Sequence, residues 1–254
     1  MRPIYFISDA HLGCTATAHN RTRERRLVRF LDSIRDKAGA VYMLGDMFDF
    51  WYEYRECVPK GYTRFLGKVS ELTDAGVEIH FFVGNHDVWC RDYLERECGC
   101  TVHQRPATVE LGDKVFFLAH GDGLGDGNRQ FKMLRAVFHN RTCQWLFRWL
   151  HPDVGIRLGL AWAANSRRKH QRLGIEPYMG ENLEPLVVFA KDYVRSHPSV
   201  NYFVFGHRHI ELDLMLSRTT RVLILGDWLE QFTFGVFDGE QFWMENYIEG
   251  DTQP

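Results

Sequence analysis

Residue types that bind metal ions follow five short apolar runs of this 254-residue chain, each at the point where a run ends. The first such residues after the runs are Asp9, Asp46, Asn85, His120 and His207. Two of them are followed two positions later by a histidine, His11 and His209. In an extended segment this spacing places both side chains on one face. Imidazole and oxygen ligands in this combination can hold divalent cations.

Each of these residues also has a structural interpretation. An aspartate at a strand end usually caps the following helix, and a histidine beside glycine is usually structural. Here, however, all five stand at the end of an apolar run and in a small-residue context. Packing alone explains that combination poorly, so we expect the side chains to serve a common site.

The runs themselves are rich in β-branched or aromatic residues, which is typical of buried strands. They cover residues 4–7, 41–44, 77–83, 115–119 and 202–205. Helical patterns at 20–37 and 61–74 separate the first three runs, and this order predicts parallel pairing. Because ligands of such sheets gather at the carboxyl ends of the strands, the candidate ligands are expected at one edge.

The pattern changes near the end of the chain. One further helix is predicted over 180–196. Strands are then predicted at 211–216, 221–225, 232–237 and 241–248. The short turns between these strands are typical of antiparallel hairpins. Together the elements indicate an α/β (α+β) protein.

Composition excludes several classes of protein. Hydrophobic residues make up 45% and charged residues 25% of the chain, a mixture typical of globular proteins rather than disordered chains, collagens or coiled coils. No apolar run approaches the ~20 residues of a membrane span, and the N-terminal run is too short for a signal peptide. The six cysteines form no Cys-x-x-Cys pair, so we expect reduced thiols in a cytoplasmic protein.

Positive charge is concentrated in one segment. Residues 129–172 contain ten Lys or Arg and one acid, a net charge of +9, whereas the rest of the chain carries −11. Large apolar side chains recur there at roughly helical spacing, and Pro152 separates two helical stretches. Two interpretations stay open. The segment is either a helical hairpin that packs on the core with solvated arginines, or a functional insertion.

Five sequence blocks resemble the motifs of the calcineurin-like metallophosphoesterases. They are Asp9-Ala10-His11, Gly45-Asp46-Met47-Phe48-Asp49, Gly84-Asn85-His86-Asp87, His120-Gly121-Asp122 and Gly206-His207-Arg208-His209. The resemblance spans residues 9–209 and implies a four-layer αββα sandwich of two mixed sheets, with the trailing hairpins in the second sheet. It also implies two divalent metal ions, with manganese favoured and iron or zinc as alternatives.

The resemblance assigns a ligand set to each metal. One ion would be held by Asp9, His11, Asp46 and His209, and the other by Asp46, Asn85, His120 and His207. A hydroxide bridging the two ions would attack phosphorus without forming a phosphoenzyme. His86 would act as proton donor or transition-state stabiliser, kept protonated near neutral pH by the carboxylate of Asp49. Asp87 and Asp122 would orient ligands or cap loops.

The segment Phe48-Asp49-Phe50-Trp51 and the basic, aromatic insertion resemble the UDP-2,3-diacylglucosamine pyrophosphatases of lipid A synthesis. That resemblance implies a core of residues 1–127 and 174–254 with a helical lid over 128–173. The apolar chamber for acyl chains would be lined by Trp145, Phe147, Trp149, Leu150, Leu158 and Trp162. Contacts to substrate would come from Asn85, His86, Asp126, Asn165, Ser166, Lys169 and His207.

One departure from that family bears on the substrate. Its members typically have Gly-Asn-Arg-Asp, with an arginine where this chain has His86, and they often have a glutamate where this chain has Asp49. The expected reaction is hydrolysis of the pyrophosphate of UDP-2,3-diacylglucosamine to UMP and 2,3-diacylglucosamine 1-phosphate. The alternatives are another calcineurin-like phosphodiesterase or phosphomonoesterase, acting on a nucleotide or nucleic acid, and a non-enzymatic scaffold on the same fold.

The charge pattern and the ligand set weigh on these alternatives. A complete ligand set argues against a scaffold, and an acidic body argues against a nucleic-acid substrate. The basic segment predicts peripheral contact with the cytoplasmic face of an inner membrane, because anionic lipids attract nearby Lys and Arg. No protein partner is expected.

Overall fold

The computed structural model describes residues 1–14, 20–125, 129–173 and 178–248. Its larger sheet has six strands in the order β11-β10-β1-β2-β3-β4. Their bounds are β1 (Ile4–Ile7), β2 (Ala40–Leu44), β3 (Glu78–Phe82), β4 (Thr101–His103), β10 (Thr233–Phe237) and β11 (Phe242–Asn246). Strands β1 to β4 run parallel, as predicted for the first three runs, whereas β10 is antiparallel to both of its neighbours.

The second sheet has five strands in the order β5-β6-β7-β9-β8. Their bounds are β5 (Ala107–Leu111), β6 (Lys114–Ala119), β7 (Val200–Phe205), β8 (Glu211–Met215) and β9 (Arg221–Leu225). The three central strands are parallel and the two edge strands are antiparallel. Two mixed sheets confirm the predicted fold class.

Alternate residues of β1 face opposite layers. Phe6 lies between the sheets, where its ring stacks on that of Phe116 with centroids 5.9 Å apart. Tyr5 points away from that layer and meets the ring of Phe30 at 6.2 Å. A strand covered on both faces needs apolar residues at every position, which explains its uninterrupted apolar run.

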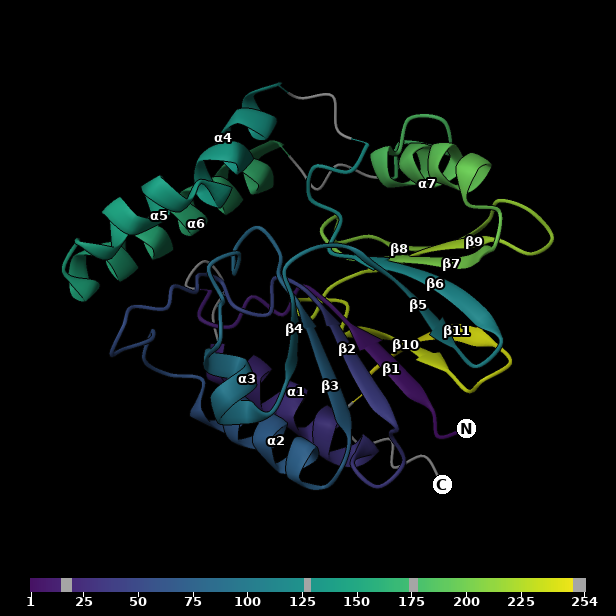
Figure 1. Ribbon diagram of the computed structural model, residues 1–254, viewed down its shortest axis with the longest axis horizontal. Coiled ribbons are helices and arrows are strands. Elements are labelled where there is room, and N and C mark those ends of the chain that lie inside the picture. The colour runs from purple at the N-terminus through teal and green to yellow at the C-terminus, as the bar shows by residue number, and fades with distance from the viewer. Residues whose placement is uncertain (15–19, 126–128, 174–177, 249–254) are drawn as a thin grey trace.

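Helices complete the four layers that Figure 1 shows. The six-stranded sheet packs on α1 (Asn20–Ile34), α2 (Thr63–Asp74) and α3 (Tyr93–Cys98). The five-stranded sheet packs on α7 (Pro185–Ser196). The last helix begins five residues later than predicted, at a proline in its first turn, where the missing N–H leaves no helical bond unmade.

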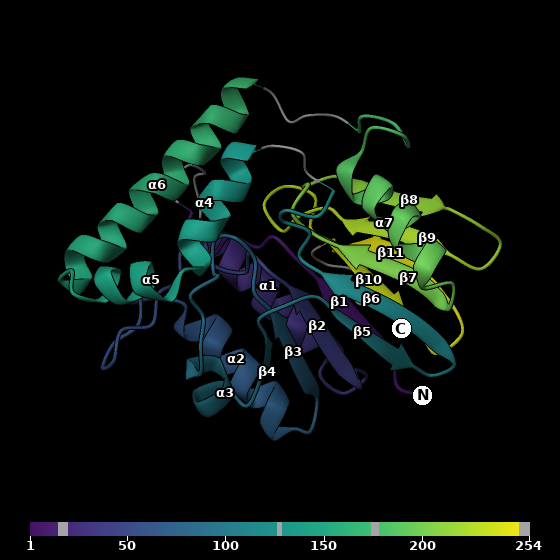
Figure 2. The same cartoon turned by 45° about the horizontal axis from the view of Figure 1, so that its top comes forward.

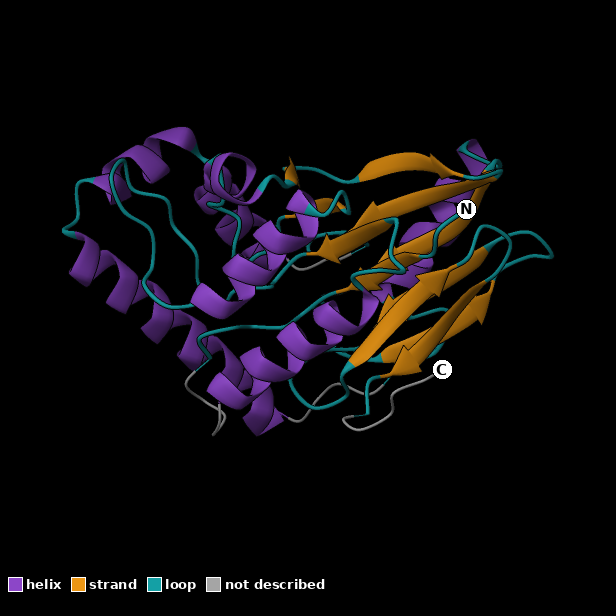
Figure 3. Cartoon of the chain, turned by 90° about the horizontal axis from the view of Figure 1, so that it is seen from below, coloured by secondary structure: helices purple, strands orange, loops and turns teal. Residues whose placement is uncertain are grey.

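The basic segment forms three helices where the sequence pattern predicts two. They are α4 (Arg129–His139), α5 (Arg141–Arg148) and α6 (Pro152–Leu173). The additional break falls at Asn140, whose side-chain oxygen accepts from the backbone N–H groups of Thr142 and Cys143 and so caps α5. The three helices lie side by side and project from the sandwich (Figure 2), at the end of the molecule remote from the N-terminus (Figure 3).

The placement of one predicted hairpin is wrong. Both C-terminal strand pairs are antiparallel hairpins, but only β8 and β9 join the second sheet, whereas β10 pairs with β1 and extends the first. A hairpin pattern predicts only that two consecutive strands pair with each other. The pairing of Tyr5 with Val236, which adds β10 to the first sheet, joins distant parts of the chain and leaves no local pattern in the sequence. The pattern also missed α3, β4 and β5, which are short.

Within the described ranges, no helix combines the length and the apolar character that crossing a bilayer would require.

Candidate metal centre and its adjoining chamber

The loops that carry the predicted ligands have an unusual backbone. Among the described residues, seven other than glycine have positive φ, and five of these are predicted metal ligands. The five are Asp9 (φ 55°), His11 (41°), Asp46 (52°), His207 (68°) and His209 (52°). Such conformations cost of order 1–3 kcal/mol each. Because they persist at the ends of three different strands, they indicate that the fold holds these side chains toward one point.

The first group of side chains consists of Asp9, His11 and His209. The Nε2 atoms of the two histidines lie 3.2 Å apart, and Oδ1 of Asp9 lies 3.3 Å from Nε2 of His209 and 3.7 Å from Nε2 of His11. That oxygen is buried and has no hydrogen-bond partner among the described residues. A buried carboxylate oxygen facing two imidazole nitrogens fits a cation.

The second group centres on Asp46 and His120. Oδ2 of Asp46 lies 3.3 Å from Nε2 of His120 and 3.8 Å from Nε2 of His11, and Oδ1 of Asn85 lies 3.2 Å from Nε2 of His120. Asp46 therefore stands between the two groups, as a bridging ligand must. The ring of His207 lies 5.1 Å from that of His120.

Each of three histidines is oriented through the nitrogen that faces away from the cluster. Nδ1 of His120 donates to the carbonyl oxygen of Leu44 at 2.9 Å. Nδ1 of His209 lies 3.1 Å from the carboxylate of Asp227, and Nδ1 of His11 lies 3.5 Å from that of Asp49. This arrangement turns every Nε2 toward the cluster and sets the tautomer that binds metal.

The charges of the cluster are those that a cation would need. Burial acts to raise the pKa of Asp9, but the charge of His209 and the neighbouring imidazole of His11 lower it to about 2. Burial likewise opposes ionisation of Asp46, yet the charge of His120 and its hydrogen bond to the carboxylate hold the pKa of Asp46 well below its ordinary value. Both carboxylates are thus anionic in the protein interior, where unpaired negative charge is costly.

Asp87 caps the ligand loops, as predicted, whereas Asp122 forms an ion pair with the helical segment. Asp87 is buried and accepts hydrogen bonds from the backbone N–H groups of Gly84 at 2.6 Å and Met47 at 2.9 Å, which ties two ligand loops together. Oδ2 of Asp122 accepts from Nε of Arg135 at 2.7 Å. Arg135 belongs to α4, so this ion pair joins the helical segment to the His-Gly-Asp loop.

The predicted pairing of His86 with the carboxylate of Asp49 needs correction. Nδ1 of His86 donates to the main-chain oxygen of Asp49 at 2.8 Å, and the Asp49 carboxylate lies against His11. Burial lowers the pKa of His86 below its ordinary value, which is the opposite of the protonated imidazole that was expected. A main-chain oxygen carries no full charge, so it stabilises an imidazolium less than a carboxylate does.

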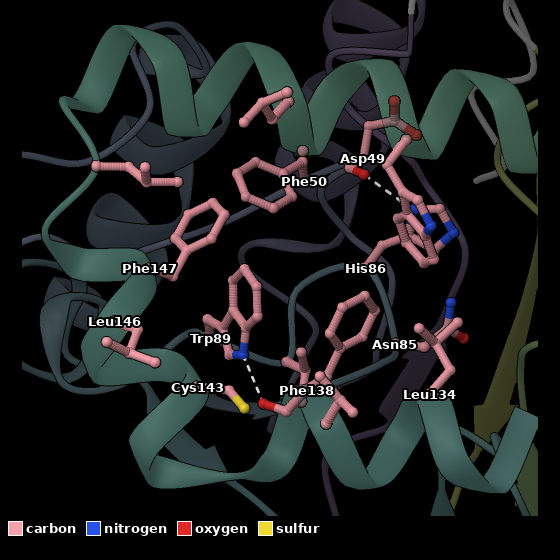
Figure 4. Close-up of a pocket in the computed structure, with 16 residues that line it drawn as sticks. Asp49, Phe50, Asn85, His86, Trp89, Leu134, Phe138, Cys143, Leu146 and Phe147 are labelled. Atoms are coloured by element: carbon pink, nitrogen blue, oxygen red, sulfur yellow. Dashed lines mark hydrogen bonds between the residues drawn. The ribbon is translucent and has the colours of Figure 1, made fainter.

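An apolar chamber of about 640 Å³ opens beside the cluster (Figure 4). Asp49, Asn85 and His86 line its polar end, and its walls combine core residues with residues of all three helices α4–α6. The core contributes Phe50, Val88 and Trp89, which the sequence analysis missed, and the helices contribute Leu134, Val137, Phe138, Cys143, Leu146, Phe147, Leu150, Leu158, Gly159 and Trp162. Four of the six predicted chamber residues are therefore in its wall.

The other two predicted chamber residues do not line it. Trp145 is 54% exposed and Trp149 is 75% exposed, with their rings in edge-to-face contact at 5.8 Å. Helix α5 has 3.6 residues per turn, so a face that places Leu146 and Phe147 in the chamber turns Trp145 and Trp149 away. Apolar character identified the helix, but only packing decides which of its faces is inside.

The predicted polar contacts are only partly described. Asn165 and Ser166 lie on α6 and are not part of the chamber wall. Asp126 and the side chain of Lys169 lie outside the described residues. Asp227, which orients His209, was missed, because the segment that carries it shows no motif beyond a lone Gly-Asp pair.

Comparison with known proteins agrees with this geometry. The family model for calcineurin-like phosphoesterases matches residues 2–211. A "UDP-2,3-diacylglucosamine hydrolase" of Porphyromonas gingivalis is 46% identical over 96% of this chain and 97% of its own length. A protein of the same name from Vibrio vulnificus is 30% identical over 89% of this chain and 90% of its own length.

Among solved structures, the Escherichia coli phosphoesterase Yfce aligns with 15% identity and a TM-score of 0.45, over 94% of this chain and 90% of that one. The family model and the curated relatives cover most of the chain, and the range matched by the family model contains all five ligand blocks. The chain therefore belongs to the calcineurin-like phosphoesterase family, is a hydrolase, and has the candidate ligands for the divalent metal ions that the family implies.

Proposed function

We propose that this protein hydrolyses the pyrophosphate of UDP-2,3-diacylglucosamine, releasing UMP and 2,3-diacylglucosamine 1-phosphate. The observation that carries the proposal is the apolar chamber, which begins at Asn85 and His86 beside the cluster of candidate ligands. A nucleotide without acyl chains has no large apolar group that would fill an apolar cavity of about 640 Å³, whereas acyl chains are stabilised by burial in such a cavity. The names of the relatives support the same substrate.

Two divalent ions would occupy the cluster. Asp9, His11 and His209 would hold one, Asn85, His120 and His207 the other, and Asp46 both. The mixture of imidazole and oxygen ligands suits manganese, with iron or zinc as alternatives. When bound, the ions supply positive charge that activates water and stabilises the phosphoryl group during displacement.

His86 would act on the phosphate from the mouth of the chamber. Its Nδ1–H is held by the main-chain oxygen of Asp49, which fixes the ring and leaves Nε2 available. Because the free imidazole has a lowered pKa, it needs the negative charge of a bound phosphate to take up a proton. A proton held at Nε2 can then be donated to the departing oxygen. Asp49 positions both His86 and His11.

We infer that residues 128–173 form a lid on a core of residues 1–127 and 174–254. Phe138 and Phe147 of the helices pack on Trp89 of the core, with ring centroids 5.4 Å and 4.9 Å away. Acyl chains would lie between these surfaces. Polar contacts to the sugar or phosphate would come from Asp126, Asn165, Ser166 and Lys169.

The outer face of the lid favours a position at a membrane. Trp149 is 75% exposed and Val154 is 50% exposed, and the surrounding segment, residues 129–172, carries a net charge of +9. Exposed aromatic and basic side chains together are typical of peripheral contact with anionic lipid. We propose that the enzyme works in the cytoplasm against the inner membrane.

A substitution that fills the chamber tests the substrate. Leu158 lies in the wall, and the L158W change adds bulk there, whereas V154W introduces a tryptophan one helical turn away on the same helix, outside the wall. We expect L158W to lower kcat/KM for UDP-2,3-diacylglucosamine at least tenfold and to leave a small chromogenic phosphodiester unaffected, with V154W normal on both. Equal effects of both variants on both substrates would instead favour another phosphodiesterase with a structural helical segment.

A further inference from the structure

A second cavity, of about 710 Å³, adjoins the lid and has no role in the proposed reaction. It shares Val88 and Trp89 with the acyl chamber but contains none of the candidate metal ligands. Its walls come from two parts of the chain, the core segments 88–91 and 104–105 and the lid residues between 139 and 148. We call this cavity the arginine groove, because Arg91, Arg105, Arg141 and Arg148 all line it.

The arginine groove carries positive charge that the protein does not neutralise. No acidic residue belongs to its lining. Within the described ranges, neither a carboxylate nor another acceptor pairs with Arg105, Arg141 or Arg148, and the guanidinium of Arg91 reaches only the amide oxygen of Gln144 at 3.4 Å. By contrast, the lid arginine beside the metal loop, Arg135, has its carboxylate at 2.7 Å.

The groove is held in shape by hydrogen bonds between lid and core. The hydroxyl of Tyr52 donates to the main-chain oxygen of Gln144 at 2.7 Å. Nε1 of Trp89 donates to the main-chain oxygen of Phe138, also at 2.7 Å (Figure 4). Burial raises the pKa of Tyr52, and the charges of Arg91 and Arg148 oppose that shift. One arginine of the core and one of the lid therefore lie near the same phenol, where their charges repel unless an anion lies between them.

We propose that the arginine groove is a binding site for a phosphate group, bridging the core arginines and the lid arginines. Guanidinium groups present paired donors that match phosphate oxygens, and several around one cavity are typical of phosphate recognition. Trp145 adds a half-exposed aromatic surface at the rim, suited to the non-phosphate part of the ligand. Free phosphate and the headgroup of an anionic phospholipid share this chemistry.

Two binding measurements on the manganese-loaded protein test the proposal. Calorimetric titration with inorganic phosphate counts the sites, and co-sedimentation with phosphatidylglycerol or phosphatidylcholine vesicles detects headgroup binding. The test variant is R141A/R148A. The conservative R141K/R148K variant keeps the charge, and R157A removes one charge from α6, outside the groove lining. Hydrolysis of a small phosphodiester verifies that each variant is folded.

The wild-type protein is expected to bind either one phosphate more than R141A/R148A or phosphatidylglycerol vesicles more tightly. The loss is expected to be roughly a hundredfold for two charge-assisted contacts, with R141K/R148K closer to wild type and R157A unchanged. A loss confined to calorimetry identifies a soluble ligand, and a loss confined to phosphatidylglycerol vesicles identifies a lipid headgroup. If R141A/R148A matches the wild type in both measurements, or if R157A loses as much, the groove is not a phosphate site.

Discussion

Gly159 determines how closely helix α6 approaches the core, and its replacement by alanine gives a sharp test of the chamber. A Cβ atom at this position would lie 2.3 Å from two ring carbons of Phe50. Phe50 cannot move aside freely, because it is 7% exposed and its ring contacts Trp89 at 5.9 Å and Phe147 at 6.4 Å. Both Gly159 and Phe50 line the chamber.

The size of the effect follows from the distance. Non-bonded carbons rest at about 3.5–4.0 Å, so α6 or the Phe50 ring must move by more than about 1 Å. Overpacking of this kind typically costs 1–3 kcal/mol, while alanine gains about 1 kcal/mol over glycine in a helix. We therefore expect G159A to lower the free energy of unfolding by up to about 2 kcal/mol. KM for the acylated substrate should rise severalfold because the chamber wall is displaced.

The matched control is G67A in helix α2, where a Cβ atom would meet nothing within 4 Å and φ is not positive. There only the helix propensity acts, so G67A is expected to raise stability by as much as about 1 kcal/mol. Urea unfolding measures both variants, and turnover of the acylated substrate and of a small phosphodiester separates the chamber from the metal cluster. A G159A protein that is stabilised like G67A and keeps its KM would refute the packing argument.

Three further predictions concern the cluster. D46A and H120A are expected to abolish turnover at saturating manganese and to lower the bound metal measured by atomic emission, and near-normal activity would contradict the ligand assignment. D227N is expected to weaken metal affinity roughly 10–100-fold, because His209 loses the carboxylate on its Nδ1, whereas D238N, at an exposed turn, should leave affinity unchanged. Removal of metal by a chelator is expected to lower the unfolding temperature, because a metal that binds only the folded protein stabilises it, and metal at ~100 Kd contributes about 2.7 kcal/mol. An unfolding temperature that is unchanged by the chelator would contradict a preformed cation site.

The sequence already contained the fold class and the positions of the candidate ligands. Strands covered on both faces must be apolar throughout, so they stand out in the sequence as apolar runs. The polar residues that follow the runs can then be assigned to the edge of the sheet. That logic located Asp9, Asp46, Asn85, His120 and His207, and it gave the parallel order of β1, β2 and β3. The helical character of α4–α6 was evident from the spacing of their apolar residues.

Only the tertiary structure decided which atoms meet. Asp49 and His86 are 37 residues apart in the sequence. Nothing in the sequence distinguishes a contact through the Asp49 carboxylate from one through its main-chain oxygen. Three further features are also products of long-range packing. They are the outward position of Trp145 and Trp149, the membership of β10 in the first sheet, and the convergence of two arginines of helix α5 with two from segments 88–91 and 104–105. Local pattern reports which side of an element is apolar. What covers that side depends on contacts between segments that are distant in the chain.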